Sequence, residues 1–286
     1  MGTSGVSFLA PAKLNLSLQV FGKRPDGYHH IRSVMVPVSL YDEVTVEEAP
    51  PGIAVECDAP GIPTDGTNSC HKAAALFLAW SGAPPGVRVR IRKTIPAESG
   101  LGGGSSDAAA ALKGLIALTG KHPPAEELSA MAARIGADVP FFLPGGAALV
   151  EGFGERLTPL PWDVPFHVVI VRPAFGFSTR EGYARLGREP GEVPPSCGVP
   201  SFRTLSDVAA AVRNDFEEAW GPACPEIAEI KGGLTAVGAL AAGLSGSGSA
   251  VFGIFASEAA AREAGGKLSR NRGGGEGRRV FVARSV

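Results

Sequence analysis

The chain lacks an excess of charge of either sign, because 27 Lys and Arg are balanced by 28 Asp and Glu. Proteins that bind nucleic acid or acidic membrane surfaces usually carry a net positive charge. The sequence also lacks a run of the ~20 apolar residues that span a bilayer, and it does not open with a basic stretch followed by a long apolar core. We therefore expect a cytoplasmic protein with no nucleic-acid or membrane partner. A small anionic ligand remains compatible with these totals.

Cysteine is scarce, and its spacing excludes two further classes of protein. The cysteines are Cys57, Cys70, Cys197 and Cys224. No two of them form a C-x-x-C pair, so the sequence predicts neither a disulfide framework nor a zinc site, and the thiols are expected to be reduced. The histidines at 30, 71, 122 and 167 lack ligand-like spacing, and no metal ligands are predicted among the side chains.

Glycine and proline are plentiful, at 39 and 24 residues, and they separate segments of regular structure. Alternating or β-branched apolar residues predict strands over 14–24, 34–48, 86–96, 166–173 and 278–286. Apolar spacing and capping residues predict helices over 68–80, 106–118, 126–135, 178–186, 205–220 and 224–234. We expect a turn at 23–30, a hairpin around Gly145 and Gly146, and a mobile loop at 188–201. The pattern restarts near residue 160, which predicts two domains, residues 1–160 and 161–286.

The run "GLGGGSSDAA" at 100–109 is the strongest local signal. It is not a Walker A loop, since no Gly-Lys pair has the required partners, and not a dinucleotide fingerprint, since Ser105 replaces the third glycine. Glycines let the backbone approach a ligand closely, and a helix start offers unpaired N–H groups. The run therefore predicts an anion site, in which Ser105 and Ser106 either cap the helix or contact phosphate and Mg²⁺. A flexible loop with a serine N-cap is the alternative.

Further motifs accompany the glycine run in a fixed order. They are "PAKLNL" at 11–16, "RPDGYH" at 24–29, "GADVPFF" at 136–142 and "LSGSGS" at 244–249. Together they resemble the GHMP kinase superfamily over residues 9–286. The resemblance implies a two-domain α+β fold, with an N-terminal domain like ribosomal protein S5 domain 2 and a C-terminal ferredoxin-like domain. It also implies phosphoryl transfer from ATP, with Mg²⁺, to a small-molecule alcohol.

The resemblance implies catalytic roles for Asp138 and Lys13. Asp138 would take the proton of the reacting hydroxyl, and Lys13 would keep that carboxylate ionised. On sequence alone, an Asp in "GADVP" is also typical of a turn, and Lys13 is also typical of a surface position. The residues implied to bind ATP are Pro96, Ala97, Glu98, Ser99, Gly100, Leu101, Gly102, Gly103, Gly104, Ser105 and Ser106.

The "PAKLNL", "RPDGYH" and "GADVPFF" motifs indicate, within the superfamily, a substrate that contains cytidine diphosphate. The resemblance implies that Tyr28 stacks on the cytosine, that His29 hydrogen-bonds to it and that Tyr183 supplies a second ring. Asn15 would position the substrate, and Ser245, Gly246, Ser247 and Gly248 would cover its diphosphate. Without the resemblance, Tyr183 is typical of a half-buried helix residue, and 245–248 of a tight turn. Asp107 suits the helix dipole and is given no catalytic role.

Two rival functions remain open at this point. A related kinase for homoserine, mevalonate or a sugar would not need the "DGYH" element. A non-catalytic ligand-binding protein on the same fold would be expected to lose Lys13 or Asp138, and both are present. A monomer or weak homodimer is expected.

Overall fold

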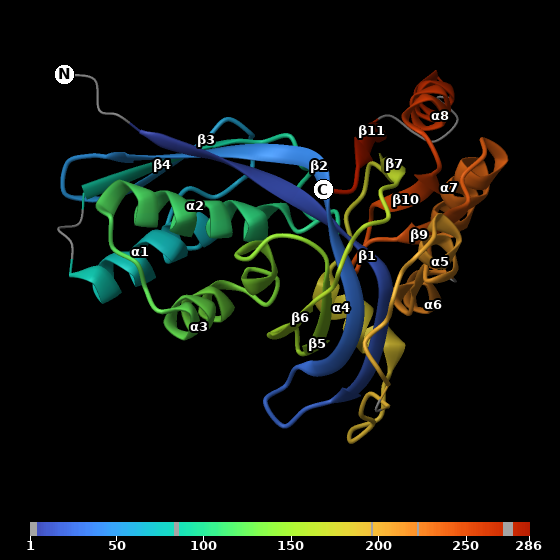
Figure 1. Ribbon diagram of the computed structural model, residues 1–286, viewed down its shortest axis with the longest axis horizontal. Coiled ribbons are helices and arrows are strands. Elements are labelled where there is room, and N and C mark those ends of the chain that lie inside the picture. The colour runs from blue at the N-terminus through green and yellow to red at the C-terminus, as the bar shows by residue number, and fades with distance from the viewer. Residues whose placement is uncertain (1–4, 83–85, 196, 222, 271–276) are drawn as a thin grey trace. The chain divides into compact units, whose positions relative to one another are not determined.

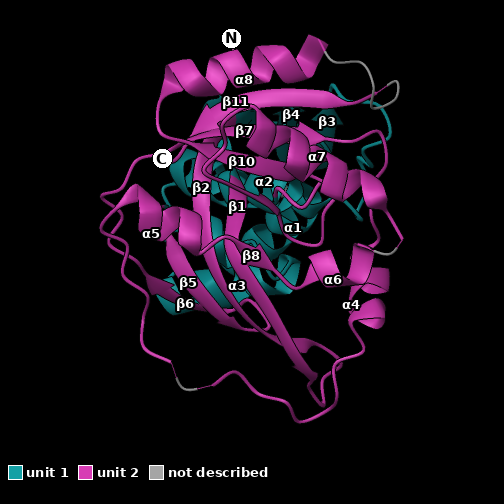
Figure 2. Ribbon diagram, turned by 90° about the vertical axis from the view of Figure 1, so that its right-hand side faces the viewer, with its two compact units in different colours: residues 1–12, 41–97, 102–145 teal, residues 13–40, 98–101, 146–286 magenta. Residues whose placement is uncertain are grey.

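The computed structural model describes residues 5–82, 86–195, 197–221, 223–270 and 277–286 (Figure 1). The chain forms two compact units, which Figure 2 distinguishes by colour. Unit 1 comprises Met1–Ala12, Tyr41–Ala97 and Gly102–Gly145, and unit 2 comprises Lys13–Leu40, Glu98–Leu101 and Gly146–Val286. Strands β1 (Val6–Lys23) and β2 (His29–Glu48) run through both units. The domain boundary near residue 160 stays a prediction.

Unit 1 places helices on one face of a sheet (Figure 1). Its strands follow the order β3–β4–β2, with β4 parallel to β3 and antiparallel to β2. The elements that lie wholly in it are β3 (Gly52–Cys57), α1 (Ser69–Ser81), β4 (Gly86–Arg92), α2 (Gly103–Thr119), α3 (Ala125–Ile135) and the short 3₁₀ helix η1 (Pro140–Phe142). A Cβ at Gly114 of α2 would lie 2.5 Å from Val46 Cγ2 of β2. A glycine is therefore what lets this helix pack so closely on the sheet.

The strand β4 explains the alternating sequence "GVRVRIR". Val87, Val89 and Ile91 are at most 3% exposed, while the arginines between them face glutamates of neighbouring strands. Arg88 and Arg90 each lie 3.0 Å from Glu47, through different carboxylate oxygens. Opposite charges across neighbouring strands stabilise a sheet modestly. This basic stripe is thus a paired, solvated sheet face.

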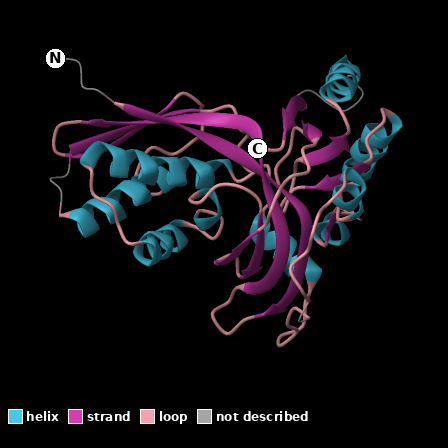
Figure 3. Cartoon of the chain, viewed as in Figure 1, coloured by secondary structure: helices cyan, strands magenta, loops and turns pink. Residues whose placement is uncertain are grey.

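Unit 2 contains an antiparallel sheet of strand order β11–β7–β10–β9. Its elements are β7 (His167–Arg172), α4 (Thr179–Leu186), α5 (Leu205–Ala210), α6 (Phe216–Trp220), α7 (Pro225–Ala236), β9 (Ala241–Leu244), β10 (Val251–Phe255), α8 (Glu258–Arg270) and β11 (Arg279–Arg284). Helix α7 packs on β9 and β10, and α8 on β7 and β11. Strand, helices, two strands, helix and strand in this order form the ferredoxin-like arrangement. The mixture of helices and strands (Figure 3) confirms the predicted α+β fold.

Three short strands complete unit 2 beside the first two long ones. They are β5 (Ala148–Gly152), β6 (Arg156–Pro159) and β8 (Arg213–Asn214). β5 pairs antiparallel with β2 and β6, and β8 pairs parallel with β1. A turn over residues 24–28 joins β1 to β2, as the Pro-Asp-Gly sequence predicts.

Two local predictions were wrong, and one strand was not predicted. Residues 205–220 are not one helix, because Arg213 and Asn214 pair with β1 between α5 and α6. The hairpin expected around Gly145 and Gly146 is absent among the described residues, since η1 precedes these glycines and the strands β5 and β6 meet later, at 153–155. Strand β3 was not predicted at all.

The loop 188–201 has contacts that its sequence did not predict, and its residue 196 lies outside the described residues. Gly22 donates a backbone hydrogen bond to Glu192 at 2.8 Å, and Arg32 donates to Gly198 O at 2.6 Å. A Cβ at Gly22 would lie 2.3 Å from Glu189 O, so the loop approaches the strand where only glycine fits. In the part of the chain that the structure describes, no helix is long and apolar enough to cross a membrane.

Candidate active site

Strand β1 carries two buried polar residues within an apolar stretch. Lys13 is 3% exposed and Asn15 is 1% exposed. The Lys13 ammonium donates a hydrogen bond to Asn15 Oδ1, so the two side chains share a strand face, as residues two positions apart in a strand do. Burying an ammonium is costly unless it is paired. Lys13 is therefore not the surface lysine of the alternative interpretation.

A short relay of hydrogen bonds fixes the orientation of the Asn15 amide. Asn15 Nδ2 donates to Ser33 Oγ at 2.7 Å, and Ser33 Oγ donates to the backbone oxygen of Ser17 at 2.6 Å. Because the amide nitrogen is committed to Ser33, the amide oxygen faces the Lys13 ammonium. Sequence reasoning missed Ser33. Its signal was a hydroxyl within the buried strand "IRSVMV".

The segment Glu98–Leu101 of the glycine run belongs to unit 2. Lys13 N donates to Leu101 O at 2.9 Å, and Ala250 N donates to Ser99 O at 3.0 Å. Gly100 has φ 77°, and a Cβ there would lie 1.9 Å from Ser245 O. Only glycine fits this position, which fixes the backbone between strand β1 and the C-terminal glycine motif, the "LSGSGS" sequence at 244–249.

The residues from Pro96 to Glu98 differ in exposure, and Glu98 has a strained backbone. Pro96 is buried, while Ala97 and Glu98 are exposed. Glu98 has φ 52°, in the left-handed region that residues other than glycine rarely adopt. Such strain concentrates at functional sites.

The C-terminal glycine motif lies against the buried lysine. Ser245 Oγ donates to Gly100 O at 3.0 Å, and a Cβ at Gly246 would lie 3.1 Å from Lys13 Nζ. Unit 2 thus brings together Lys13, Asn15, the segment 98–101 and the motif 245–248, while the roles of these residues stay predictions.

Side chains that the sequence did not single out hold this motif in place. Asn214 Nδ2 donates to Gly246 O at 2.8 Å, and Trp220 Nε1 donates to Ser247 O at 2.9 Å. The hydroxyls of Thr179 and Ser247 are 2.8 Å apart. The motif therefore has a fixed shape. Its supports come from distant parts of the sequence, which is why no local pattern revealed them.

Helix α2 begins in the other part of the glycine run, in unit 1. Its first residue is Gly103, and Gly102 precedes it in the left-handed region with φ 73°. Among the described residues no side chain caps this helix, so the structure does not support the alternative in which a serine caps it. Ser105 and Ser106 lie inside the first turn instead. The first N–H groups of the helix stay available for an anion.

The glycines of the first turn face different surroundings. A Cβ at Gly103 would lie 3.0 Å from Ile95 Cγ2 and 3.2 Å from Lys93 Nζ. A Cβ at Gly104 would meet no described atom within 4 Å. Gly103 therefore faces the protein interior, while Gly104 faces open space where a ligand can approach.

A buried ion-pair cluster lies beneath this turn, entirely within unit 1. The Lys93 ammonium contacts the Asp42 carboxylate and lies 2.7 Å from Asp107 Oδ2. Asp42 Oδ1 accepts hydrogen bonds from the backbone of Thr94 and Ile95, at 2.6 and 2.8 Å. The cluster therefore joins the residue after β4, strand β2 and helix α2, in which Asp107 lies just beyond the first turn. Sequence reasoning missed Lys93 and Asp42 and gave Asp107 only a dipole effect.

Burial and mutual charge shift the titration of this cluster. Burial raises the pKa of Asp107 to about 7, against the opposing effect of Lys93. Burial alone would lower the pKa of Lys93, but Asp107 and Asp42 raise it overall. Two carboxylates thus compete for one ammonium, so the second negative charge is disfavoured.

Asp138 lies between α3 and η1, in unit 1. Helix α3 ends at Ile135 with Gly136 as its C-cap, and Val139 N donates back to Gly136 O at 3.1 Å. A Cβ at Gly136 would lie 3.9 Å from Ser105 Oγ. This turn therefore lies beside the first turn of α2, and Asp138 is half-buried there.

The predicted base-binding residues form two ring contacts in unit 2. The rings of His29 and Tyr183 stack, with centroids 4.7 Å apart and planes at 15°. Burial and the charge of Lys23 lower the pKa of His29. Tyr28 is 56% exposed, and its ring lies 5.0 Å from that of Phe153. The sandwich of Tyr28 and Tyr183 around a base stays a prediction.

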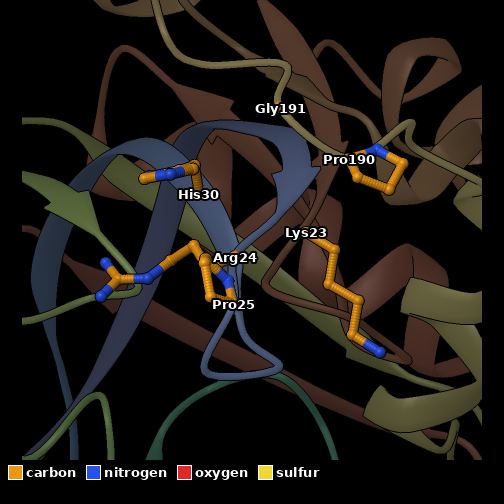
Figure 4. A pocket seen from close by; sticks show the side chains of 6 residues that line it. All are labelled: Lys23, Arg24, Pro25, His30, Pro190 and Gly191. Atoms are coloured by element: carbon orange, nitrogen blue, oxygen red, sulfur yellow. The ribbon is translucent and has the colours of Figure 1, made fainter.

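A separate cleft of about 390 Å³ opens beside the turn that carries these rings. Its lining residues are Lys23, Arg24, Pro25, His30, Pro190 and Gly191 (Figure 4). The charged ends of Lys23 and Arg24 point to opposite sides in this view. None of the predicted site residues lines this cleft.

Comparison with known proteins defines the class of protein to which this chain belongs. The N-terminal domain model of the GHMP kinases matches residues 68–146, and the C-terminal model matches residues 200–273. The fold and the glycine motifs are therefore those of a GHMP kinase, an enzyme that uses ATP as phosphate donor.

Individual relatives identify the family within the GHMP kinases. A 4-diphosphocytidyl-2-C-methyl-D-erythritol kinase of Geobacter sp. (strain M21) is 42% identical over 94% of this chain and 96% of its own length. A crystal structure of 4-(cytidine 5'-diphospho)-2C-methyl-D-erythritol kinase matches with a TM-score of 0.78 and 35% identity, covering 98% of this chain and 99% of that one. The chain belongs to the family of these kinases. Homoserine kinase from Cytophaga hutchinsonii matches with a TM-score of 0.74 but only 19% identity over 99% of this chain and 95% of that one, so it shares the fold alone.

Proposed function

We propose that this kinase transfers the γ-phosphoryl group of ATP to the 2-hydroxyl of 4-(cytidine 5'-diphospho)-2-C-methyl-D-erythritol, a step of the non-mevalonate route to isoprenoid precursors. The observation that best supports phosphoryl transfer is the buried Lys13 ammonium, which is hydrogen-bonded to Asn15 and lies beside Gly246. The choice of substrate is supported by the relatives, which carry this activity in their names at 42% and 35% identity.

Asp138 is the proposed general base, and Lys13 assists it. In phosphoryl transfer the protein mainly positions the groups and stabilises charge, while a carboxylate accepts the proton of the attacking hydroxyl. An ammonium near the reacting hydroxyl favours its ionised form. Asn15 would fix the direction of that ammonium and position the substrate.

The proposed ATP site runs from Pro96 to Ser106. The triphosphate would accept hydrogen bonds from the first N–H groups of α2, on the open side at Gly104. Ser245–Gly248 would cover the diphosphate of the second substrate. Because 245–248 and 98–101 contact each other, both substrates would meet at this junction.

We also propose that Mg²⁺ accompanies ATP. Within the described residues no group of three or more His, Cys, Asp or Glu could hold a metal ion, so the ion would arrive largely on phosphate oxygens, as Mg²⁺ usually does. Ser106 Oγ is buried and has no hydrogen-bond partner among the described residues, which suits an oxygen ligand. Bound there, the ion would supply charge neutralisation at the transferred phosphate.

A coupled ADP-release assay over a panel of alcohols tests the proposal. The panel contains the cytidine diphosphate substrate, methylerythritol 4-phosphate, homoserine and mevalonate. We expect turnover with the first compound alone, because remote binding energy in the base supports catalysis. Equal turnover with and without the base, or use of homoserine or mevalonate, would contradict the assignment.

Assembly and location are proposed from the composition of the chain. We propose a monomer or weak homodimer in the cytoplasm, without a nucleic-acid partner, on the basis of balanced charge and four free cysteines. Light scattering across a range of protein concentrations would test the oligomeric state.

A further inference from the structure

The turn that carries Tyr28 packs against a second turn, between β5 and β6. Pairing of Ile31 with Gly152 brings the start of β2 beside the end of β5. The second turn then presents Phe153, whose ring lies 5.0 Å from the Tyr28 ring at an interplanar angle of 33°. Phe153 is half-buried, whereas Tyr28 is 56% exposed. The more buried ring thus supports the more exposed one.

Arg24 adds a cation to the same stack. Its guanidinium carbon lies 5.2 Å from the centre of the Phe153 ring, within the range of a cation–π interaction. Asp26 lies 2.8 Å and Glu155 3.8 Å from the guanidinium nitrogens, so each turn contributes a carboxylate. The guanidinium is therefore held over the ring from both sides.

The backbone of both turns is fixed as well. Arg24 N donates to Tyr28 O at 2.6 Å, and Tyr28 N donates to Asp26 Oδ1 at 3.1 Å. In the other turn, Phe153 N donates to Glu155 Oε2 at 2.6 Å. Neither ring therefore depends on a loose segment of chain for its position.

A lone exposed tyrosine on a turn loses rotamer freedom when a ligand stacks on it, and this loss weakens binding. A supporting ring reduces the loss, because aromatic pairs are favourable at these separations. We propose that Phe153 is a positioning residue that holds the Tyr28 ring ready to stack on a pyrimidine base. This inference rests on the proposed use of a cytidine-containing substrate. His29 stacks on Tyr183 instead, so Phe153 acts through Tyr28.

The test compares steady-state kinetics of the full-length enzyme with Phe153→Ala, Phe153→Tyr, Tyr28→Ala and the double variant. Phe153→Ala should raise KM for the cytidine diphosphate substrate about two- to tenfold, the range of an aromatic pair, with kcat and the KM for ATP unchanged. Phe153→Tyr keeps the ring and should restore the wild-type KM. In the Tyr28→Ala background, Phe153→Ala should have no further effect.

Phe281→Ala is a matched control, since Phe281 is also half-buried and lies 4.9 Å beneath the guanidinium of Arg279. It should leave all constants unchanged. An equal effect of Phe153→Ala with and without Tyr28, a parallel rise in the KM for ATP, or a lowered substrate KM would overturn the inference. Phe153→Leu replaces Phe153→Ala if the latter does not fold. If wild type also accepts the substrate without its base, both the proposed function and this inference fail, whereas intact base dependence isolates a failure of the inference.

Discussion

The first turn of α2 and the turn carrying Tyr28 are held in place by opposite means. Beneath the first, Lys93, Asp42 and Asp107 form ion pairs whose side chains are at most 8% exposed. Around the second, Phe153 and Arg24 stack beside a ring that is 56% exposed. Breaking a buried ion pair costs about 3–5 kcal/mol, whereas an aromatic pair contributes about 0.5–1.5 kcal/mol.

This difference matches what each turn is proposed to recognise. A phosphate bound on backbone N–H groups requires those groups at fixed positions, and a rigid charged foundation supplies them. A base bound by stacking presents a large flat surface that tolerates small shifts. Substitutions can therefore distinguish the proposed chemistry at Asp138, the ion pairs beneath α2 and the stacking at Tyr28.

The largest effect is expected from Asp138→Asn. Loss of the proposed general base should lower kcat by ~10² to 10⁴, with little change in substrate KM or in the free energy of unfolding. Steady-state assays measure kcat and KM, and urea denaturation measures the free energy of unfolding. Near-wild-type kcat would remove Asp138 from the mechanism.

Next in size is Lys93→Met, which removes the shared ammonium. Two buried carboxylates would be left without their cation, so the free energy of unfolding should fall by about 3–5 kcal/mol. Urea denaturation gives this value, with Lys267→Met on the exposed side of α8 as control. Equal free energies of unfolding of the two variants would show that the ion-pair cluster does not stabilise the fold.

Replacing two adjacent glycines distinguishes the loop from its foundation. Gly104→Val projects into the open side of the turn, so it should raise the KM for ATP roughly tenfold or more, as expected for lost charged hydrogen bonds, and leave stability unchanged. Gly103→Val meets Ile95 and Lys93 and should lower stability as well. If Gly104→Val leaves nucleotide affinity unchanged in calorimetry, the turn does not bind phosphate.

Tyr28→Ala should affect substrate affinity alone. Loss of one stacked ring is expected to cost ~1–3 kcal/mol of base binding, and this cost should appear in the KM for the cytidine substrate and not in that for ATP. His29→Ala should reduce discrimination between cytidine and uridine substrates, because hydrogen bonds distinguish the bases and stacking barely does. A change in ATP affinity in either variant would argue against separate sites.

The smallest effect concerns pH. Burial and Lys23 lower the pKa of His29 from its ordinary 6.5, so near that pH the folded protein holds more of this ring neutral than the unfolded chain does. Unfolding then takes up a proton, and the free energy of unfolding should fall as pH drops below about 6.5. The substrate KM should stay flat through neutral pH and rise only in acid. Lys23→Gln should move that rise to higher pH, and an unchanged profile would contradict this account.

Local structure was largely predictable from the sequence, while contacts between distant segments were not. Helix α1, predicted over 68–80, occupies Ser69–Ser81, because Asn68 caps it and Gly82 ends it. The break at Arg213 and Asn214 was missed because it depends on pairing with β1. Apolar spacing alone favours a continuous helix there.

The candidate site follows the same division. Lys13 and Asn15 were found together because they alternate along one strand. The partnership of Lys93 with Asp42 and Asp107 was missed, since it joins a strand end, another strand and a helix start. No periodicity or spacing in the sequence predicts that these three side chains contact one another. Phe153 was missed for the same reason.

The division of the chain into discontinuous units has a consequence for synthesis. Every segment of unit 1 lies within residues 1–145, whereas unit 2 needs residues 13–40 and 98–101 together with 146–286. During translation, unit 1 can form first, while the apolar strand around Leu14 and Leu16 waits for its partners. At 5–20 residues per second the remaining chain takes roughly 7–30 s to emerge. For that interval Lys13 lies on a strand that lacks its later partners in unit 2, and exposed apolar strands of this kind are prone to aggregation.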